Sequence, residues 1–89
     1  MFILIIDGRE DEGAYSVKDE NGQQVLYIFE EEDDATRYAL MLETSNYPPM
    51  NVLEVDDKVL LHTCDMHGYN YAIITKNDLV IPPEQHDSI

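Results

Sequence analysis

The chain has 89 residues, which suffices for one domain with a modest hydrophobic core. An apolar fraction of 44%, with six tyrosines and two phenylalanines, excludes a disordered acidic tail. The formal net charge of −14 disfavours binding to nucleic acid or to an anionic membrane, because both carry negative charge.

The first third of the chain predicts three β-strands. Residues 2–6 read FILII, a continuous apolar run that is typical of a strand covered on both faces. Residues 13–18 alternate between polar and apolar side chains and predict a second strand. Asn21-Gly22 predicts a hairpin with a type I′ turn, and residues 24–29 predict the third strand.

The middle of the chain predicts a helix followed by a strand. Ala35, Tyr38, Ala39 and Leu42 recur at the spacing of one helical face. The prolines in NYPP end this helix, because proline lacks an N–H donor and restricts the residue before it. A fourth strand is predicted at about residues 51–55.

The last third predicts a second helix and a fifth strand. Asp56 is the predicted N-cap of this helix, and Asp57 lies in its first turn. Gly68 is the predicted C-terminal stop, because glycine readily adopts the left-handed conformation that ends many helices. Residues 69–75 predict the fifth strand.

The order β-β-β-α-β-α-β predicts an α+β fold. We expect a two-layer sandwich in which a mixed β-sheet carries two helices on one face, ferredoxin-like in character. Residues 1–78 form the predicted single domain, and residues 79–89 form a short edge segment and a flexible tail. The order of the strands in the sheet is left open.

The sequence also bears on the compartment. No apolar run approaches the roughly 20 residues of a transmembrane helix, and no signal peptide is recognisable. The lone Cys64 excludes an intramolecular disulfide framework and is typical of a reducing compartment. We therefore expect a cytoplasmic protein (stromal if it belongs to a plastid) without membrane insertion.

The acidic residues are predicted to gather at one pole of the sheet. If the first strand runs up, the hairpins return the third strand upward, and each crossover returns the next strand upward as well. This path places thirteen of the 19 acidic residues at the upper pole, including the run of five carboxylates at residues 30–34. One or two acids suffice to complement a helix N-terminus, whereas five within a Debye length repel one another.

A basic partner or a cation would offset that repulsion. We therefore predict a non-enzymatic accessory protein that binds a basic protein surface through this pole. The predicted partner-binding residues are Asp11, Glu12, Glu30, Glu31, Glu32, Asp33, Asp34, Asp56 and Asp57. A solvated acidic surface without any partner is the simpler interpretation of the same charges.

Two other functions fit the same pole. The first is a divalent-cation or small-ligand sensor with weak Ca²⁺ or Mg²⁺ binding, although no stretch matches the spacing of an EF-hand loop. The second is a nucleic-acid mimic that blocks a basic groove. Catalysis is disfavoured because the paired carboxylates lie in solvated loops, and no cofactor is expected.

Two smaller patterns are ambiguous. His62, Cys64 and His67 have a metal-like spacing, but the three do not share one helical face, which favours a buried cysteine and a helix-terminal histidine. A redox role for Cys64 is disfavoured among so many acids. The tyrosines at positions 47, 69 and 71 are either core residues or a contact surface.

Three segments resemble a known family. They are EGAYS at residues 12–16, FEEEDDATRYALMLE at residues 29–43 and NYPPMNV at residues 46–52. Together they are similar to the domain of unknown function 3110 family over about residues 1–75, and EDDATRYA is the most specific part. The resemblance implies a protein of cyanobacteria or plastids with no established activity, so it assigns no functional residue.

Overall fold

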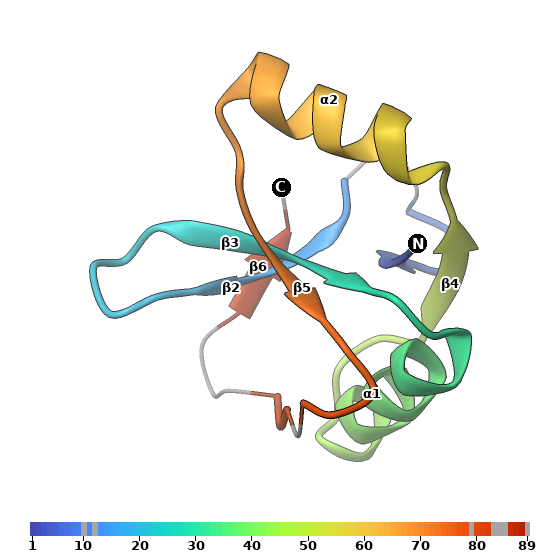
Figure 1. Ribbon diagram of the computed structural model, residues 1–89. Helices are drawn as coiled ribbons and strands as arrows, with labels where there is room; N and C mark the ends of the chain where they lie inside the picture. The colour runs from blue at the N-terminus through green and yellow to red at the C-terminus, as the bar shows by residue number, and fades with distance from the viewer. Residues whose placement is uncertain (10, 12, 79, 83–85, 89) are drawn as a thin grey trace.

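The computed structural model describes residues 1–9, 11, 13–78, 80–82 and 86–88. The α+β class is confirmed, with two helices packed against a mixed, six-stranded sheet (Figure 1). Along the chain the elements are β1 (Phe2–Ile6), β2 (Tyr15–Lys18), β3 (Gln24–Phe29), α1 (Glu32–Thr44), β4 (Met50–Glu54), α2 (Asp57–His67), β5 (Asn70–Ile74) and β6 (His86–Ser88). In this part of the chain, no helix combines the length and apolar character that a membrane span requires.

The sheet is organised around β1 and β3. Strand β1 pairs antiparallel with β4 on one side and with the end of β3 on the other. Strand β3 also pairs antiparallel with β2 and parallel with β5. Because β3 and β4 are both antiparallel to β1, strands β3, β4 and β5 all run in the same direction, as the two crossovers predict.

The direction of β1 differs from the prediction. The sequence predicts that β1 and β3 run in the same direction, because two successive hairpins reverse the chain twice. Instead Phe2 lies opposite both Phe29 and Glu54, so β1 starts at the end where β3 and β4 finish. The cause is tertiary: the crossover from β3 to β4 skips one strand position, and β1 fills it.

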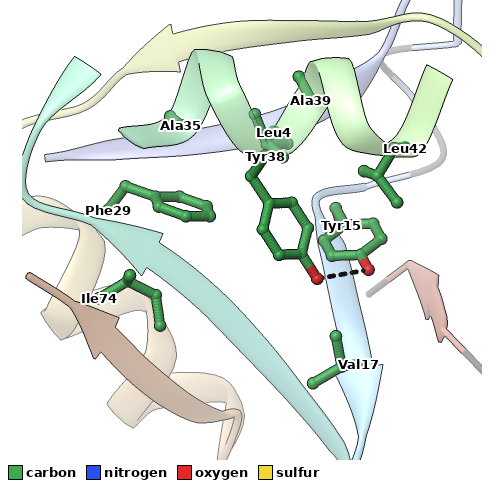
Figure 2. Close-up of a cluster of buried hydrophobic side chains, with 9 residues drawn as sticks. All are labelled: Leu4, Tyr15, Val17, Phe29, Ala35, Tyr38, Ala39, Leu42 and Ile74. Carbon is green, nitrogen blue, oxygen red and sulfur yellow. Dashed lines mark hydrogen bonds between the residues drawn. The ribbon is translucent and has the colours of Figure 1, made fainter. Parts of the chain in front are cut away.

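The two helices also lie differently from the prediction, which placed both on one face. Side chains of a strand alternate between the faces of a sheet, and here each face has its own core under its own helix. Figure 1 shows α1 below the sheet and α2 above it. The buried core on the α1 face comprises Leu4, Tyr15, Val17, Phe29, Ala35, Tyr38, Ala39, Leu42 and Ile74 (Figure 2). The core on the α2 face comprises Ile3, Leu26, Ile28, Leu60 and Cys64.

The predicted local signals are largely confirmed. The carboxylate of Asp56 accepts hydrogen bonds from the N–H groups of Lys58 and Val59, and Gly68 ends α2 with a φ of 67°. Strands β2 and β3 form the predicted hairpin. Its turn is not type I′, however, because Asn21 does not have the positive φ which that turn needs. Asp19 holds the turn instead, by accepting hydrogen bonds from two backbone N–H groups.

The C-terminal segment departs from the predicted flexible tail. Residues His86–Ser88 form β6, which pairs antiparallel with β2 and extends the sheet. The predicted edge segment at residues 79–81 begins at a position outside the described residues. The domain boundary at residue 78 stays a prediction.

Candidate functional site

Strands β3, β4 and β5 all finish at one end of the sheet. Ile74 at the end of β5 pairs with Phe29 at the end of β3, and Phe2 of β1 lies between Phe29 and Glu54 of β4. With strands about 4.8 Å apart, this row is roughly 14 Å wide. The segments that leave these strands carry acids, and we call the surface they form the acidic end: Glu30, Glu31, Glu32, Asp33, Asp34, Glu54, Asp56, Asp57 and Asp78.

Helix polarity explains part of this clustering. Both helices begin at the acidic end, with Glu32, Asp33 and Asp34 in the first turn of α1 and Asp57 in that of α2. The unpaired N–H groups of a helix N-terminus carry partial positive charge, so a nearby carboxylate stabilises the helix by about 0.3–1 kcal/mol when exposed. The effect is confined to the first turn and does not extend to the acids beyond it.

One carboxylate of the acidic end is buried. Asp34 is only 7% exposed, and its Oδ1 lies 2.8 Å from a guanidinium nitrogen of Arg37, one helical turn further on. Its other oxygen, Oδ2, is buried and accepts no hydrogen bond from the residues that the structure describes. The ion pair with Arg37 therefore stabilises this carboxylate, and the role of Asp34 in the acidic end is structural.

Three further acids are engaged in local hydrogen bonds. Asp56 caps α2, and Asp57 accepts from the N–H group of Lys58 at 2.9 Å. Asp78 accepts from the N–H group of Thr75 at 2.8 Å and so holds the turn that follows β5. These contacts give each carboxylate a role in local structure.

The remaining five have no such role. They are exposed, and within the described part of the chain they make neither a side-chain hydrogen bond nor an ion pair: Glu30, Glu31, Glu32, Asp33 and Glu54. Glu31 is the clearest case, because it occupies the N-cap position of α1 yet caps no backbone N–H group. A glutamate side chain is not among those favoured for this position, whereas aspartate, asparagine, serine and threonine are.

The structure does not bring all the predicted residues together. Asp11 belongs to the loop after β1, and this loop leaves the sheet at the end opposite to the acidic end. There the N–H group of Asp7 donates to the carbonyl of Pro49, just before β4 begins, and Ala14 returns opposite Ile5. The reversed direction of β1 is the cause. Glu12 lies outside the described residues.

Two residues that join the acidic end were missing from the predicted binding set. Glu54 and Asp78 follow from the parallel crossovers, since each stands at or just after the end of a strand that runs with β3. The signal was therefore present in the order of elements.

The tyrosines divide between core and surface. The hydroxyls of Tyr15 and Tyr38 share a buried hydrogen bond of 2.9 Å (Figure 2), and the ring of Tyr47 contacts Tyr15 edge-on. Burial raises the pKa of Tyr15 to about 12 and that of Tyr38 further still. Tyr47 is thus half-buried and packs against the core, whereas Tyr69 and Tyr71 are each 38% exposed.

The metal-like pattern in α2 is not assembled. Cys64 is buried, and burial together with the nearby Asp65 raises the pKa of its thiol, which disfavours the reactive thiolate. His67 stacks on Tyr69 with ring centroids 5.2 Å apart. No three His, Cys, Asp or Glu side chains among the described residues are placed to hold a metal ion, and that part of the chain contains no pocket.

Comparison with known proteins and protein families assigns the chain to a family. No curated protein and no solved structure shows significant similarity to the chain. The match is to a family model, and it extends to residue 84, beyond the limit near residue 75 that the sequence resemblance indicated. Residues 1–84 of the 89 match DUF3110, a domain of unknown function, and the chain therefore belongs to that family.

Proposed function

We propose that the protein is a non-enzymatic accessory protein that binds a basic protein surface through its acidic end. The observation that supports this most is the state of five exposed carboxylates there. Within the described residues none of them stabilises the fold through a side-chain hydrogen bond or an ion pair: Glu30, Glu31, Glu32, Asp33 and Glu54.

Their spacing makes these carboxylates repel one another in the free protein. The ends of β3 and β4 are two strands apart, or about 10 Å, and the acids on them are therefore close to one Debye length of about 8 Å from each other. Glu54 and Glu30 also lie outside both helices and gain little from a helix N-terminus. A partner that brings positive charge to this surface relieves the repulsion.

The sign and exposure of the charges select the class of partner. Lysine and arginine side chains pair with exposed carboxylates, and complementary charge accelerates encounter and fixes orientation. Nucleic acid and anionic membranes carry the wrong sign. Exposed carboxylates also lack the water-excluded surroundings that acid–base catalysis uses, which is why we favour binding over chemistry.

A capture experiment with charge-reversed variants tests the proposal. Immobilised wild-type protein should retain a basic partner from a native lysate at low salt, and Glu31→Lys/Asp33→Lys should lose it. The matched control is Glu20→Lys/Glu43→Lys, which changes the net charge equally at exposed positions far from the acidic end. Equal retention by both double variants would rule the acidic end out as the binding surface.

A further inference from the structure

The segment that contains β5 is free of acidic residues. Residues 66–77 contain no acidic residue, in a chain that has 19 of them. Strand β5 pairs with β3 on one side, and no described residue pairs with its other side. Natural edge strands usually carry charges or proline that prevent further pairing, and β5 has neither.

Two residues of β5 direct their backbone N–H and C=O groups toward this outer edge. The carbonyl of Ile74 accepts from the N–H group of Glu30, so Ile74 directs its backbone groups toward β3, and the alternation of the strand does the same for Ala72 and Asn70. Tyr71 and Ile73 therefore direct their N–H and C=O groups outward. Beyond them, the N–H group of Thr75 is satisfied by Asp78.

The N-terminal limit of the free edge is equally defined. The N–H group of Tyr69 donates to the carbonyl of Cys64 at 2.9 Å, as part of the C-terminal cap of α2. The free edge is thus short, with two outward N–H groups and two outward carbonyls that no described residue engages.

We propose that a second copy of the chain pairs antiparallel with this edge, about a two-fold axis at Ala72. In that register Tyr71 of each copy lies opposite Ile73 of the other copy. Two residues that are opposite in an antiparallel pair, with their backbone groups facing each other, exchange both hydrogen bonds. The dimer therefore gains four hydrogen bonds and joins the two sheets into one.

The side chains and charges fit the same arrangement. Tyr71 and Ile73 lie on the α2 face of the sheet, because Ile73 packs in that core, and an aromatic side chain opposite a β-branched one is a favourable cross-strand pair. Antiparallel pairing also directs the acidic ends of the two copies to opposite ends of the joined sheet. Because the acidic ends are then far apart, the repulsion between two copies that each carry a charge of −14 is smaller than in a parallel arrangement.

The edge that β4 forms is less suited to this role. Strand β4 follows Pro48 and Pro49, and it ends in Glu54 at the acidic end. Pairing of two copies there would add charge repulsion at the strand terminus. This contrast is the reason for assigning self-association to β5.

Disulfide trapping tests the register directly. At the two-fold axis the two Ala72 Cα atoms lie about 4.5 Å apart as a non-hydrogen-bonded pair, within the range that a disulfide spans. Under mild oxidation Ala72→Cys should form a covalent dimer. Asn70→Cys, on the same strand and face, should not, because the two Asn70 positions are then about 13 Å apart. The wild-type protein is the second control, since its Cys64 is buried.

Sedimentation over protein concentrations from about 5 µM to about 500 µM tests the edge without a cross-link. Wild-type protein should change from monomer to dimer, more readily at high salt because the repulsion between copies is screened. Tyr71→Lys should weaken dimerisation at least about tenfold, whereas Met66→Lys, an equal charge change on exposed α2 surface, should not.

Three results would overturn the inference. They are a protein that stays monomeric throughout, equal cross-linking of Ala72→Cys and Asn70→Cys, or equal effects of the two lysine substitutions. Binding of an extended peptide from another protein to a monomer would also replace the second copy as the occupant. Capture of a basic partner is read out separately, because salt is expected to weaken that complex and to strengthen the dimer.

Discussion

Glu31→Asp should stabilise the protein, although it removes only one methylene group and keeps the charge. Glu31 is the N-cap of α1, with φ −113° and ψ 135°, the extended backbone conformation that a capping residue adopts. Its side chain nevertheless caps no N–H group. An aspartate carboxylate is shorter and suits the N–H groups of the residues two and three positions further on.

The second helix supplies the reference for the magnitude. Asp56 caps α2 with bonds of 3.0 Å and 3.1 Å to two N–H groups, the arrangement that α1 lacks. A capping side chain contributes about 0.5–2 kcal/mol, typically about 1 kcal/mol. For a domain of this size, 1 kcal/mol corresponds to a rise in Tm of roughly 4–8 °C.

Urea and thermal unfolding of a charge-conserving pair of variants provide the assay. Glu31→Asp should raise the free energy of unfolding by about 1 kcal/mol, and Asp56→Glu should lower it by a similar amount. If Glu31→Asp leaves the midpoint unchanged while Asp56→Glu lowers it, the first turn of α1 gains nothing from a cap. The argument that Glu31 sits there at a cost to stability would then fail.

Three further predictions concern the buried hydrogen bond between Tyr15 and Tyr38 and the ion pair between Asp34 and Arg37. Tyr15→Phe leaves the buried hydroxyl of Tyr38 without its hydrogen bond and should lower the free energy of unfolding by about 1–3 kcal/mol; Tyr15→Phe/Tyr38→Phe should recover most of the loss, and a fully additive loss would refute the pairing. The Tyr15 pKa is raised from 10.0 to about 12, so its contribution to stability should be complete below pH 10 and disappear as the pH rises to 12, measured by urea unfolding alongside tyrosinate absorbance. Arg37→Met removes the ion pair of buried Asp34 and should cost about 1–3 kcal/mol, whereas Thr36→Met beside it should change the unfolding midpoint little.

Most elements of the fold were predictable because they depend on local physics. Residues 24–29 form β3 with the predicted bounds, and α2 lies between the predicted cap Asp56 and the predicted stop Gly68. The strand-to-helix crossovers also gave the common direction of β3, β4 and β5, which brings residues 30–34 and Asp56 to one end. This part of the acidic end is therefore readable from the sequence.

The position of β1 was not predictable in the same way. The sequence of the loop after β1 does not specify the direction in which the chain returns. Local patterns do not decide whether a strand pairs with its neighbour in the chain or fills a gap between two later strands. FILII did contain a relevant signal, because a run that is apolar on both faces suits a central strand. The same signal requires cover on both faces, which two helices on one face do not supply. The prediction that Asp11 lies at the acidic end was wrong because it depended on the wrong direction for β1.

Other differences have both local and long-range causes. Asp19 determines the β2–β3 turn through its side chain, and that local hydrogen bonding prevails over the type I′ preference of Asn21-Gly22. Strand β6 forms because β2 offers a free edge to pair with. The sequence of β6 itself has few β-forming residues. The outward backbone groups of Tyr71 and Ile73 depend on the register of β5 against β3, which periodicity does not specify.

The salt dependence of binding tests the central claim most directly. The affinity for a captured basic partner should be measured from about 50 mM to about 0.5 M NaCl, for the wild type and for Glu31→Lys/Asp33→Lys. If the exposed carboxylates of the acidic end make the contact, wild-type affinity should fall steeply with salt, and the variant should bind weakly with a shallow dependence. Affinity that is insensitive to salt and equal in the two proteins would contradict the account.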